Sequence, residues 1–191
     1  PGLADPGEPR RPYAPTAFGS PGGDPHRVIA ATGGTVRVQD EGSQLVALAL
    51  AAAAPITSGE RWLDLCAGPG GKTALLAAIA REHDVTLEAN EVIPTRARLV
   101  RNALRAVPGE VVVHEEDGRS FGASHPGAFD RILVDAPCTG LGALRRRPEA
   151  RWRKTPADVA ELVPLQVELL SSALHALAPG GIVAYVTCSP H

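Results

Sequence analysis

From residue 61 onward, short apolar runs typical of buried strands alternate with longer segments of helical periodicity. This alternation indicates a parallel sheet, because parallel neighbours need a crossover connection that is usually a helix. Right-handed crossovers cover both faces of such a sheet with helices, and ligands bind beyond the carboxyl ends of its strands. The sequence therefore predicts a doubly wound α/β domain whose chemistry lies at one edge of the sheet.

The pattern places the expected elements along the chain. Strands are predicted at residues 61–66, 85–90, 110–117, 130–135 and 181–188, and helices at 71–82, 94–107 and 157–177. No helix is predicted between the third and fourth strands. Acidic or thiol side chains stand at the strand ends, namely Asp64, Cys66, Glu91, Asp117, Asp135, Cys138 and Cys188. We expect all of them at the same rim of the sheet.

Three regions are expected. Residues 1–26 hold seven prolines and five glycines, a composition that cannot offset ordering entropy by burial, and we interpret them as a linker. Residues 27–60 form an N-terminal lead-in, where the stretch SQLVALALAAAAP predicts a buried helix. Residues 61–191 form the α/β domain. The chain has no Met and starts at Pro1, which indicates a fragment of a longer product.

Composition argues against several classes of protein. A net charge of −2 gives no overall attraction to polyanions, so nucleic-acid binding would need a local basic patch. Three cysteines without a C-x-x-C pair argue against a disulfide framework or zinc, and six histidines without ligand spacing argue against any metal. The cysteine pattern instead favours a reducing, cytoplasmic setting. No apolar stretch reaches the roughly 18 residues of a membrane span, so we expect no membrane partner.

The segment DLCAGPGGKTALL places Gly68, Gly70 and Gly71 between a strand and a helix. Glycines at this point let the backbone approach a ligand closely. A phosphate-binding P-loop is one interpretation, since GKT closes the stretch, but its first glycine would fall on Cys66. An adenosine-containing cofactor is the other, because Glu91 ends the second strand, where an acid holds ribose hydroxyls.

Two of the acids also have structural interpretations. Glu91 would favour the dipole of the helix expected from Pro94. Asp117 would suit a turn before Gly118, or it would hold the adenine amino group at the end of the third strand. The glycine loop favours the ligand-binding interpretation of Glu91, and that of Asp117 stays open.

Two thiols lie at the ends of predicted neighbouring strands, Cys138 in VDAPCTGLGALRRRPEARWR and Cys188 in YVTCSPH. We expect both to face one pocket, whereas Cys66 is interpreted as a buried structural thiol. Together with DLCAGPGGKT and VQDEGSQLVALAL, these motifs resemble the Sun/RsmB family of RNA 5-methylcytosine methyltransferases. The resemblance extends from about Gly34 to His191.

The resemblance implies a Rossmann-like sheet of the class I methyltransferase type, with S-adenosylmethionine as cofactor. It implies that Cys188 is the nucleophile and that Cys138 assists. Asp135 is the third catalytic residue we expect, because a protonated or proton-sharing carboxyl there could stabilise charge on N3 of the base. The cofactor site that it implies comprises Cys66, Ala67, Gly68, Pro69, Gly70, Gly71, Lys72, Glu91, Asp117 and Asp135. The family usually has Asp at the position of Glu91, and it continues past TCS through further strands that are absent from this sequence.

The implied chemistry is covalent catalysis. C5 of cytosine is a weak nucleophile, and adding a thiolate to C6 raises its electron density. A free thiol has a pKa of about 8.5, so the site must favour the anion or remove the proton on attack. The target base must be single-stranded or flipped out of a helix.

A basic segment, ALRRRPEARWRK, directly follows Cys138. Charge runs usually form a solvated face, but next to the predicted site we favour contact with RNA phosphates. The residues concerned are Arg145, Arg146, Arg147, Arg151, Arg153 and Lys154. The sequence thus predicts an RNA (cytosine-5) methyltransferase acting on ribosomal RNA. The alternatives are a P-loop NTPase and a non-catalytic RNA-binding fragment.

Overall fold

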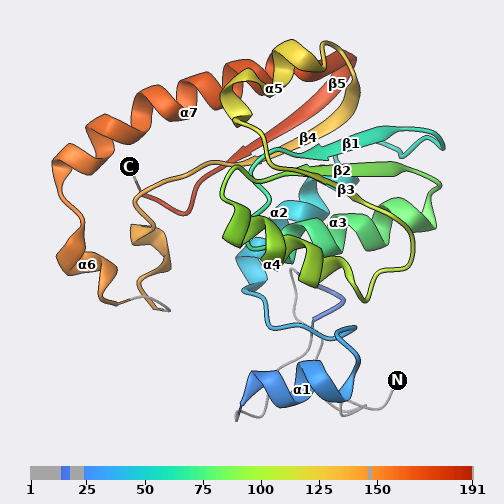
Figure 1. Ribbon diagram of the computed structural model, residues 1–191, viewed down its shortest axis with the longest axis horizontal. Helices are drawn as coiled ribbons and strands as arrows, with labels where there is room; N and C mark the ends of the chain where they lie inside the picture. Colours follow the sequence, from blue (N-terminus) through green and yellow to red (C-terminus); the bar gives the residue numbers. More distant parts are fainter. Residues whose placement is uncertain (1–13, 18–23, 146–147, 191) are drawn as a thin grey trace.

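The computed structural model describes residues 14–17, 24–145 and 148–190 of the 191-residue chain. Within them, parallel strands form one sheet in the order β3-β2-β1-β4-β5 (Figure 1). The strands are β1 (Arg61–Asp64), β2 (Thr86–Asn90), β3 (Val112–His114), β4 (Phe129–Asp135) and β5 (Leu177–Val186). The helices are α1 (Pro25–Ala31), α2 (Glu41–Ala52), α3 (Gly71–Glu82), α4 (Pro94–Leu104), α5 (Gly118–Ser124), the short 3-10 helix η1 (Leu141–Ala143), α6 (Ala150–Arg153) and α7 (Pro156–Ala176).

Both faces of the sheet are covered by helices, with α2, α3 and α4 on one side and α5 and α7 on the other (Figure 1). Side chains of successive strand residues alternate between two cores, as the pleat requires. Trp62 and Leu133 pack with α2 and α3, whereas Leu63 and Ile132 pack with α5 and α7. The predicted doubly wound parallel fold is confirmed.

The connection from β3 to β4 differs from the prediction, because α5 lies where no helix was expected. A parallel pair cannot be joined without a crossover, and this one passes from the sheet edge over β2 and β1. The sequence pattern did not predict this helix, because it is short and contains Gly122. The Gly122 amide donates to Ser172 Oγ of α7 at 2.8 Å. A Cβ at Gly122 would collide with the Ser172 carbonyl, so the close helix packing requires glycine.

Arg131 of β4 fastens α2 to the sheet from inside the core. Its side chain is 2% exposed, and its guanidinium stands over the Trp62 ring at 5.3 Å. Glu60 pairs with it at 2.8 Å. Its remaining N–H groups donate to carbonyls at the end of α2 and just beyond, those of Leu50, Ala51, Ala54 and Pro55. A buried charge persists in a core only when it is paired and hydrogen-bonded in this way.

Several boundaries differ from those predicted. Helix α1 starts at Pro25, inside the region interpreted as a linker, while residues 1–13 and 18–23 of that region lie outside the described residues. Strand β5 starts at Leu177 and pairs with β4 through an irregular register between Phe129 and Arg131. Among the described helices, none is long and apolar enough to cross a membrane.

Candidate cofactor and thiol site

The glycine loop joins β1 to α3 and is held against α4. Gly70 has a φ of +101°, and a Cβ there would lie 2.8 Å from the Val100 backbone. Gly68 fills the space between two side chains, since its amide donates to Glu91 and its carbonyl accepts from Arg96 at 2.7 Å. Both positions therefore require glycine for close approach. The loop backbone is therefore held by contacts with α4 and with Glu91.

Glu91 is 4% exposed and connects the glycine loop with the start of α4. One carboxylate oxygen accepts from the Gly68 amide at 3.1 Å, and the other accepts from the Ile93 amide at 3.0 Å. Arg96 lies 3.4 Å away as its ion-pair partner. The position at the start of α4 matches the structural interpretation, and the contact with the loop matches the ligand-binding one. Its ribose contact remains a prediction.

Asp117 caps α5, as its turn interpretation anticipated. It accepts from the Arg119 amide at 3.0 Å and pairs with the Arg119 guanidinium at 2.6 Å. These bonds from Arg119 lower the pKa of the Asp117 carboxyl, which is therefore charged at neutral pH. Contact with an adenine ring stays a prediction.

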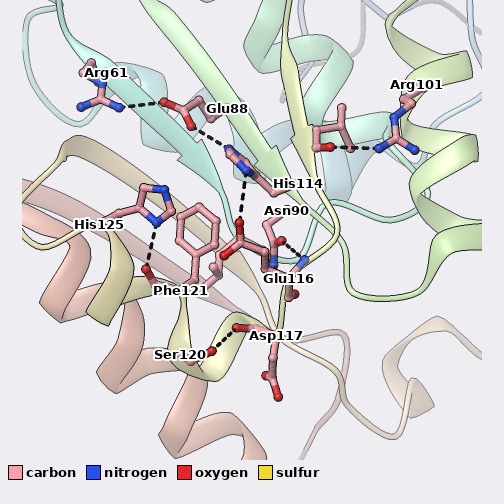
Figure 2. Close-up of polar contacts among 12 residues, drawn as sticks. Arg61, Glu88, Asn90, Arg101, His114, Glu116, Asp117, Ser120, Phe121 and His125 are labelled. Atoms are coloured by element: carbon pink, nitrogen blue, oxygen red, sulfur yellow. Dashed lines mark hydrogen bonds and ion pairs between the residues drawn. The ribbon is translucent and has the colours of Figure 1, made fainter.

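The sequence analysis did not identify Asn90, whose side chain bonds to residues after β1 and β3; Figure 2 shows its contact with Glu116. Its Nδ2 donates to the carbonyls of Leu65 and Glu116, and its Oδ1 accepts from the Glu116 amide at 3.0 Å. Asn90 thereby holds the loop that carries Asp117 next to the end of β1. Only a side chain with both donors and an acceptor can do this.

Lys72 and Asp135 meet at the carboxyl ends of β1 and β4. The Lys72 ammonium lies 2.7 Å from Asp135 Oδ2 and 3.4 Å from Ser43 Oγ of α2. Gln39, just before α2, lies against Gly71, and its Nε2 is buried without a partner among the described residues. The lead-in segment thus contributes side chains to the site. The motif VQDEGSQLVALAL contributed to the family resemblance, but it did not predict that Gln39 and Ser43 would lie at the site.

Asp64, at the end of β1, is buried beneath the glycine loop. It accepts from Thr73 Oγ1 at 2.7 Å through one oxygen, and its Oδ1 has no partner within the described part of the chain. Burial raises the pKa of Asp64 to about 7, and the nearby Asp135 adds to this rise. The site therefore contains a carboxyl that changes charge near neutral pH.

Cys138 and Cys188 are brought together by the neighbouring strands β4 and β5. Their sulfur atoms lie 3.2 Å apart. The two loops are tied to each other by the Gly142 amide, which donates to the Cys188 carbonyl at 2.9 Å, and by Thr139 Oγ1, which lies 2.8 Å from Ser189 Oγ. Partial burial and the bond with Cys138 raise the pKa of Cys188 to about 11. In this arrangement Cys188 is a thiol at neutral pH.

Cys66 has a different environment. It packs against the core of β1, β4, α5 and α7, and burial raises the pKa of its thiol to about 12, with further increase from nearby carboxylates such as Asp64. A thiol that ionises so weakly is a poor nucleophile. This environment fits the structural interpretation, and a contact between the Cys66 backbone and a cofactor stays a prediction.

The basic segment runs from η1 to the start of α7. Arg145 is 91% exposed, with Asp40 Oδ2 at 3.9 Å. Arg151 and Arg153 are exposed on α6, and Lys154 pairs with Asp158 at 3.2 Å. Arg146 and Arg147 lie outside the described residues. Over the described ranges no group of three His, Cys, Asp or Glu residues is arranged to hold a metal ion.

Comparison with known proteins relates this geometry to a family. The chain is 56% identical to a Mycobacterium tuberculosis protein named as a methyltransferase (94% of this chain, 38% of that protein). It is 41% identical to ribosomal RNA small subunit methyltransferase B of Salmonella paratyphi B (82% of this chain, 35% of that protein). The chain thus spans little more than a third of the length of these relatives.

Two solved structures share the architecture. The crystal structure of PH0851 superposes with a TM-score of 0.84 at 30% identity, covering 96% of this chain and 41% of that one. NSun6 from Pyrococcus horikoshii, solved with SFG, superposes with a TM-score of 0.71 at 25% identity, covering 81% and 38%.

The parallel sheet and the glycine loop after its first strand are those of a class I methyltransferase with a Rossmann-like fold. The family model described as 16S rRNA methyltransferase RsmB/F matches residues 51–191. The chain belongs to this family, so the resemblance seen in the sequence motifs is confirmed.

Proposed function

We propose that the protein transfers a methyl group from S-adenosylmethionine to C5 of a cytosine in ribosomal RNA, through a covalent bond between Cys188 and C6. The observation that carries this proposal is the contact between Cys138 and Cys188, whose sulfur atoms lie 3.2 Å apart. A pair of thiols from adjacent strand ends suits a reaction that needs one group to attack and another to assist release. Family membership supports methyl transfer to ribosomal RNA.

The residues at the ends of β1 and β2 fit the cofactor. Gly68 and Gly70 leave room for a close backbone approach, and the buried Glu91 carboxylate has lone pairs beyond those used by its two amide partners. The unpartnered Gln39 Nε2 lies beside the same loop and offers a donor. S-adenosylmethionine would supply an electrophilic methyl group on a positively charged sulfur. The SFG in the NSun6 structure supports a ligand of this chemical class.

The two thiols would have different roles, with Cys188 attacking the base and Cys138 assisting its release. Partial desolvation of the sulfur and the bond with Cys138 keep Cys188 protonated beforehand, so its proton must leave as the sulfur bonds to C6, and we assign the nearby Asp135 carboxylate as the acceptor. The electrons displaced from the C5–C6 bond make C5 nucleophilic. After methylation, C5 must lose its proton so that the C6–S bond can break. We assign assistance in that step to Cys138, the titratable group in contact with Cys188.

Charge that develops on N3 and O2 of the base needs stabilisation. We assign this to the Lys72 ammonium, which can donate to the base, and to Asp135 once it carries a proton that it can donate to N3; the two side chains lie 2.7 Å apart at the ends of β1 and β4. Holding Lys72 in this pair, with Ser43 beside it, fixes the ammonium without using it on a phosphate. A P-loop lysine instead reaches nucleotide phosphates, so this geometry favours the methyltransferase over the NTPase alternative.

This function would place the protein in the cytoplasm with ribosomal RNA as its partner. The test uses a longer protein that restores the length of the relatives, incubated with 16S ribosomal RNA and S-adenosylmethionine. Mass spectrometry of the RNA nucleosides should show 5-methylcytidine, and calorimetry should show binding of S-adenosylhomocysteine but not of ATP with magnesium. Methylation of another base would contradict the proposed reaction. Binding of ATP in place of S-adenosylhomocysteine would revive the NTPase alternative.

A further inference from the structure

The two tryptophans of the chain lie in opposite environments. Trp62 is 0% exposed in the core, whereas Trp152 on α6 is 83% exposed. Burying a large aromatic side chain stabilises a fold, and Trp152, being exposed, contributes little of that kind. Packing within the domain therefore does not account for Trp152, and its ring is accessible to a partner that can stack on it.

The surroundings of Trp152 are basic. The Arg151 guanidinium stands over its ring at 5.5 Å, and Arg153 lies exposed on the same helix. The nearest acids in sequence are Glu149, which is exposed, and Asp158, which is paired with Lys154. Arg151 covers one face of the ring, and on so exposed a side chain the opposite face is left for a base. A cation beside an accessible aromatic face suits a polyanion that carries flat rings, because the backbone meets the charge and a base stacks on the indole.

The helix follows the Cys138 loop along the chain and lies at the same end of the molecule as the proposed chemistry. It follows the Cys138 loop, whose Gly142 amide is bonded to the Cys188 carbonyl. Figure 1 shows α6 at the end of the molecule toward which β4 and β5 run. A nucleotide on Trp152 would therefore lie on the same side of the molecule as the thiols.

We propose that Trp152 is a stacking platform for an unpaired RNA base near the target cytosine. This rests on the proposed function. It adds a contact that only unpaired RNA can make, because a base paired within a helix cannot lie on the indole. Arg151 supports the stack from the adjacent position. Stacking on an aromatic face tolerates any base, so Trp152 favours unpaired RNA without selecting its sequence.

Tryptophan fluorescence provides the first test, with Trp62 as an internal control. The protein is titrated with a single-stranded fragment of 16S ribosomal RNA and with a duplex of the same length. Single-stranded RNA should quench the emission of the unaltered protein, and it should leave Trp152→Phe, which retains only Trp62, unquenched. Equal quenching in both proteins, or equal quenching by the duplex, would overturn the proposal.

Affinity provides the second test. Trp152→Ala should weaken binding of the single strand by about 10-fold to 100-fold, whereas Trp152→Phe keeps an aromatic face and should stay within about 5-fold. The dependence of affinity on salt should be unchanged in both variants, because no phosphate contact is removed. A thermal melt checks that the fold is intact, as expected for so exposed a residue.

The outcomes separate this inference from the proposed function. If the unaltered protein methylates RNA and Trp152→Ala does so with the same KM for RNA, the stacking role is wrong and the function stands. If the unaltered protein binds S-adenosylhomocysteine but no RNA, both fail. Loss of self-association in Trp152→Ala with unchanged RNA affinity would assign the indole to a protein contact and overturn the inference.

Discussion

The carboxyl ends of β1 and β2 differ in construction from those of β4 and β5. At the first pair, Glu91 is almost fully buried and bonded to two backbone amides, and the glycine loop has no space for a side chain. At the second pair, Cys188 is exposed and is held by a few bonds between two loops. A site that only has to bind can be rigid. The role proposed for Cys188, which is to form and break a bond with a large substrate, would need access.

The largest expected effect is at the accessible end, in the full-length enzyme. Cys188→Ala should lower methylation by about a thousandfold or more, because nothing raises electron density at C5. Cys138→Ala should instead attack, transfer the methyl group and stall, leaving a protein–RNA adduct. A denaturing gel with labelled RNA distinguishes the two. An adduct from Cys188→Ala and none from Cys138→Ala would reverse the roles.

A second prediction concerns Asp64, the carboxyl buried at the end of β1. Because Asp64 has a pKa of about 7 when folded and about 3.9 when unfolded, the folded protein retains a proton that the unfolded chain loses between these values. The free energy of unfolding should therefore fall as pH rises from about 4 to about 7, by up to about 4 kcal/mol.

Asp64→Asn removes this contribution. Urea unfolding at several pH values should show a flatter profile for this variant than for the unaltered protein. Glu161→Gln, which removes an exposed carboxyl on α7, should not flatten the profile. Parallel profiles for Asp64→Asn and the unaltered protein would show that Asp64 does not titrate in this range.

The tightness of the glycine loop can be measured with a matched pair of variants. Gly70 and Gly109 have nearly the same φ, +101° and +103°, but a Cβ at Gly109 meets no atom within 4 Å. Gly109→Ala should cost about 1–2 kcal/mol of stability for the left-handed backbone alone. Gly70→Ala should cost about 2–4 kcal/mol, because its Cβ also meets Val100 and Ala103. Equal costs would mean that the loop relaxes freely.

Binding at the same end should depend on the Glu91 carboxylate. Glu91→Ala should weaken S-adenosylhomocysteine binding by about 1–3 kcal/mol in calorimetry, since it leaves polar groups without an acceptor. Glu91→Asp keeps the charge and should lose less. If Glu91→Ala binds as tightly as the unaltered protein, the ribose site lies elsewhere.

The smallest expected effect is on the exposed basic segment. Arg145 is 91% exposed with a long ion-pair distance, so Arg145→Ala should change the free energy of unfolding by less than about 0.5 kcal/mol. The slope of RNA affinity against salt should become shallower by about one phosphate contact. An unchanged slope would show that Arg145 is only a solvated surface residue and does not contact RNA.

The sequence predicted what is determined locally. Alternating apolar runs placed each of the five strands, and the glycines between the first strand and its helix marked the tight loop between β1 and α3, because both patterns follow from backbone geometry. Pro164 did not interrupt the long helix predicted around it, and α7 passes through that residue.

The sequence did not predict contacts between distant residues. The contact of Asn90 with Glu116 depends on the pairing of β2 with β3, and the contact of Ser43 with Lys72 depends on how α2 packs on the sheet. Neither contact can be inferred from the local sequence. Arg96 has helical periodicity, and its bond with the Gly68 carbonyl depends on how α4 meets the loop. Helix α5 was missed because glycine at 122 serves packing against α7 and leaves no apolar stripe.

The guanidinium of Arg131 has a consequence for where this domain can be cut. Its acceptors come from the end of α2 and from Glu60, so a protein expressed from residue 61 would retain the cation in β4 and lose every hydrogen-bond acceptor that the structure gives it. A charge stranded in this way costs about 3–5 kcal/mol, comparable with the whole stability of many small domains. Residues 50–60, which precede the first strand and were interpreted as part of a lead-in, therefore belong to the folding unit of the α/β domain.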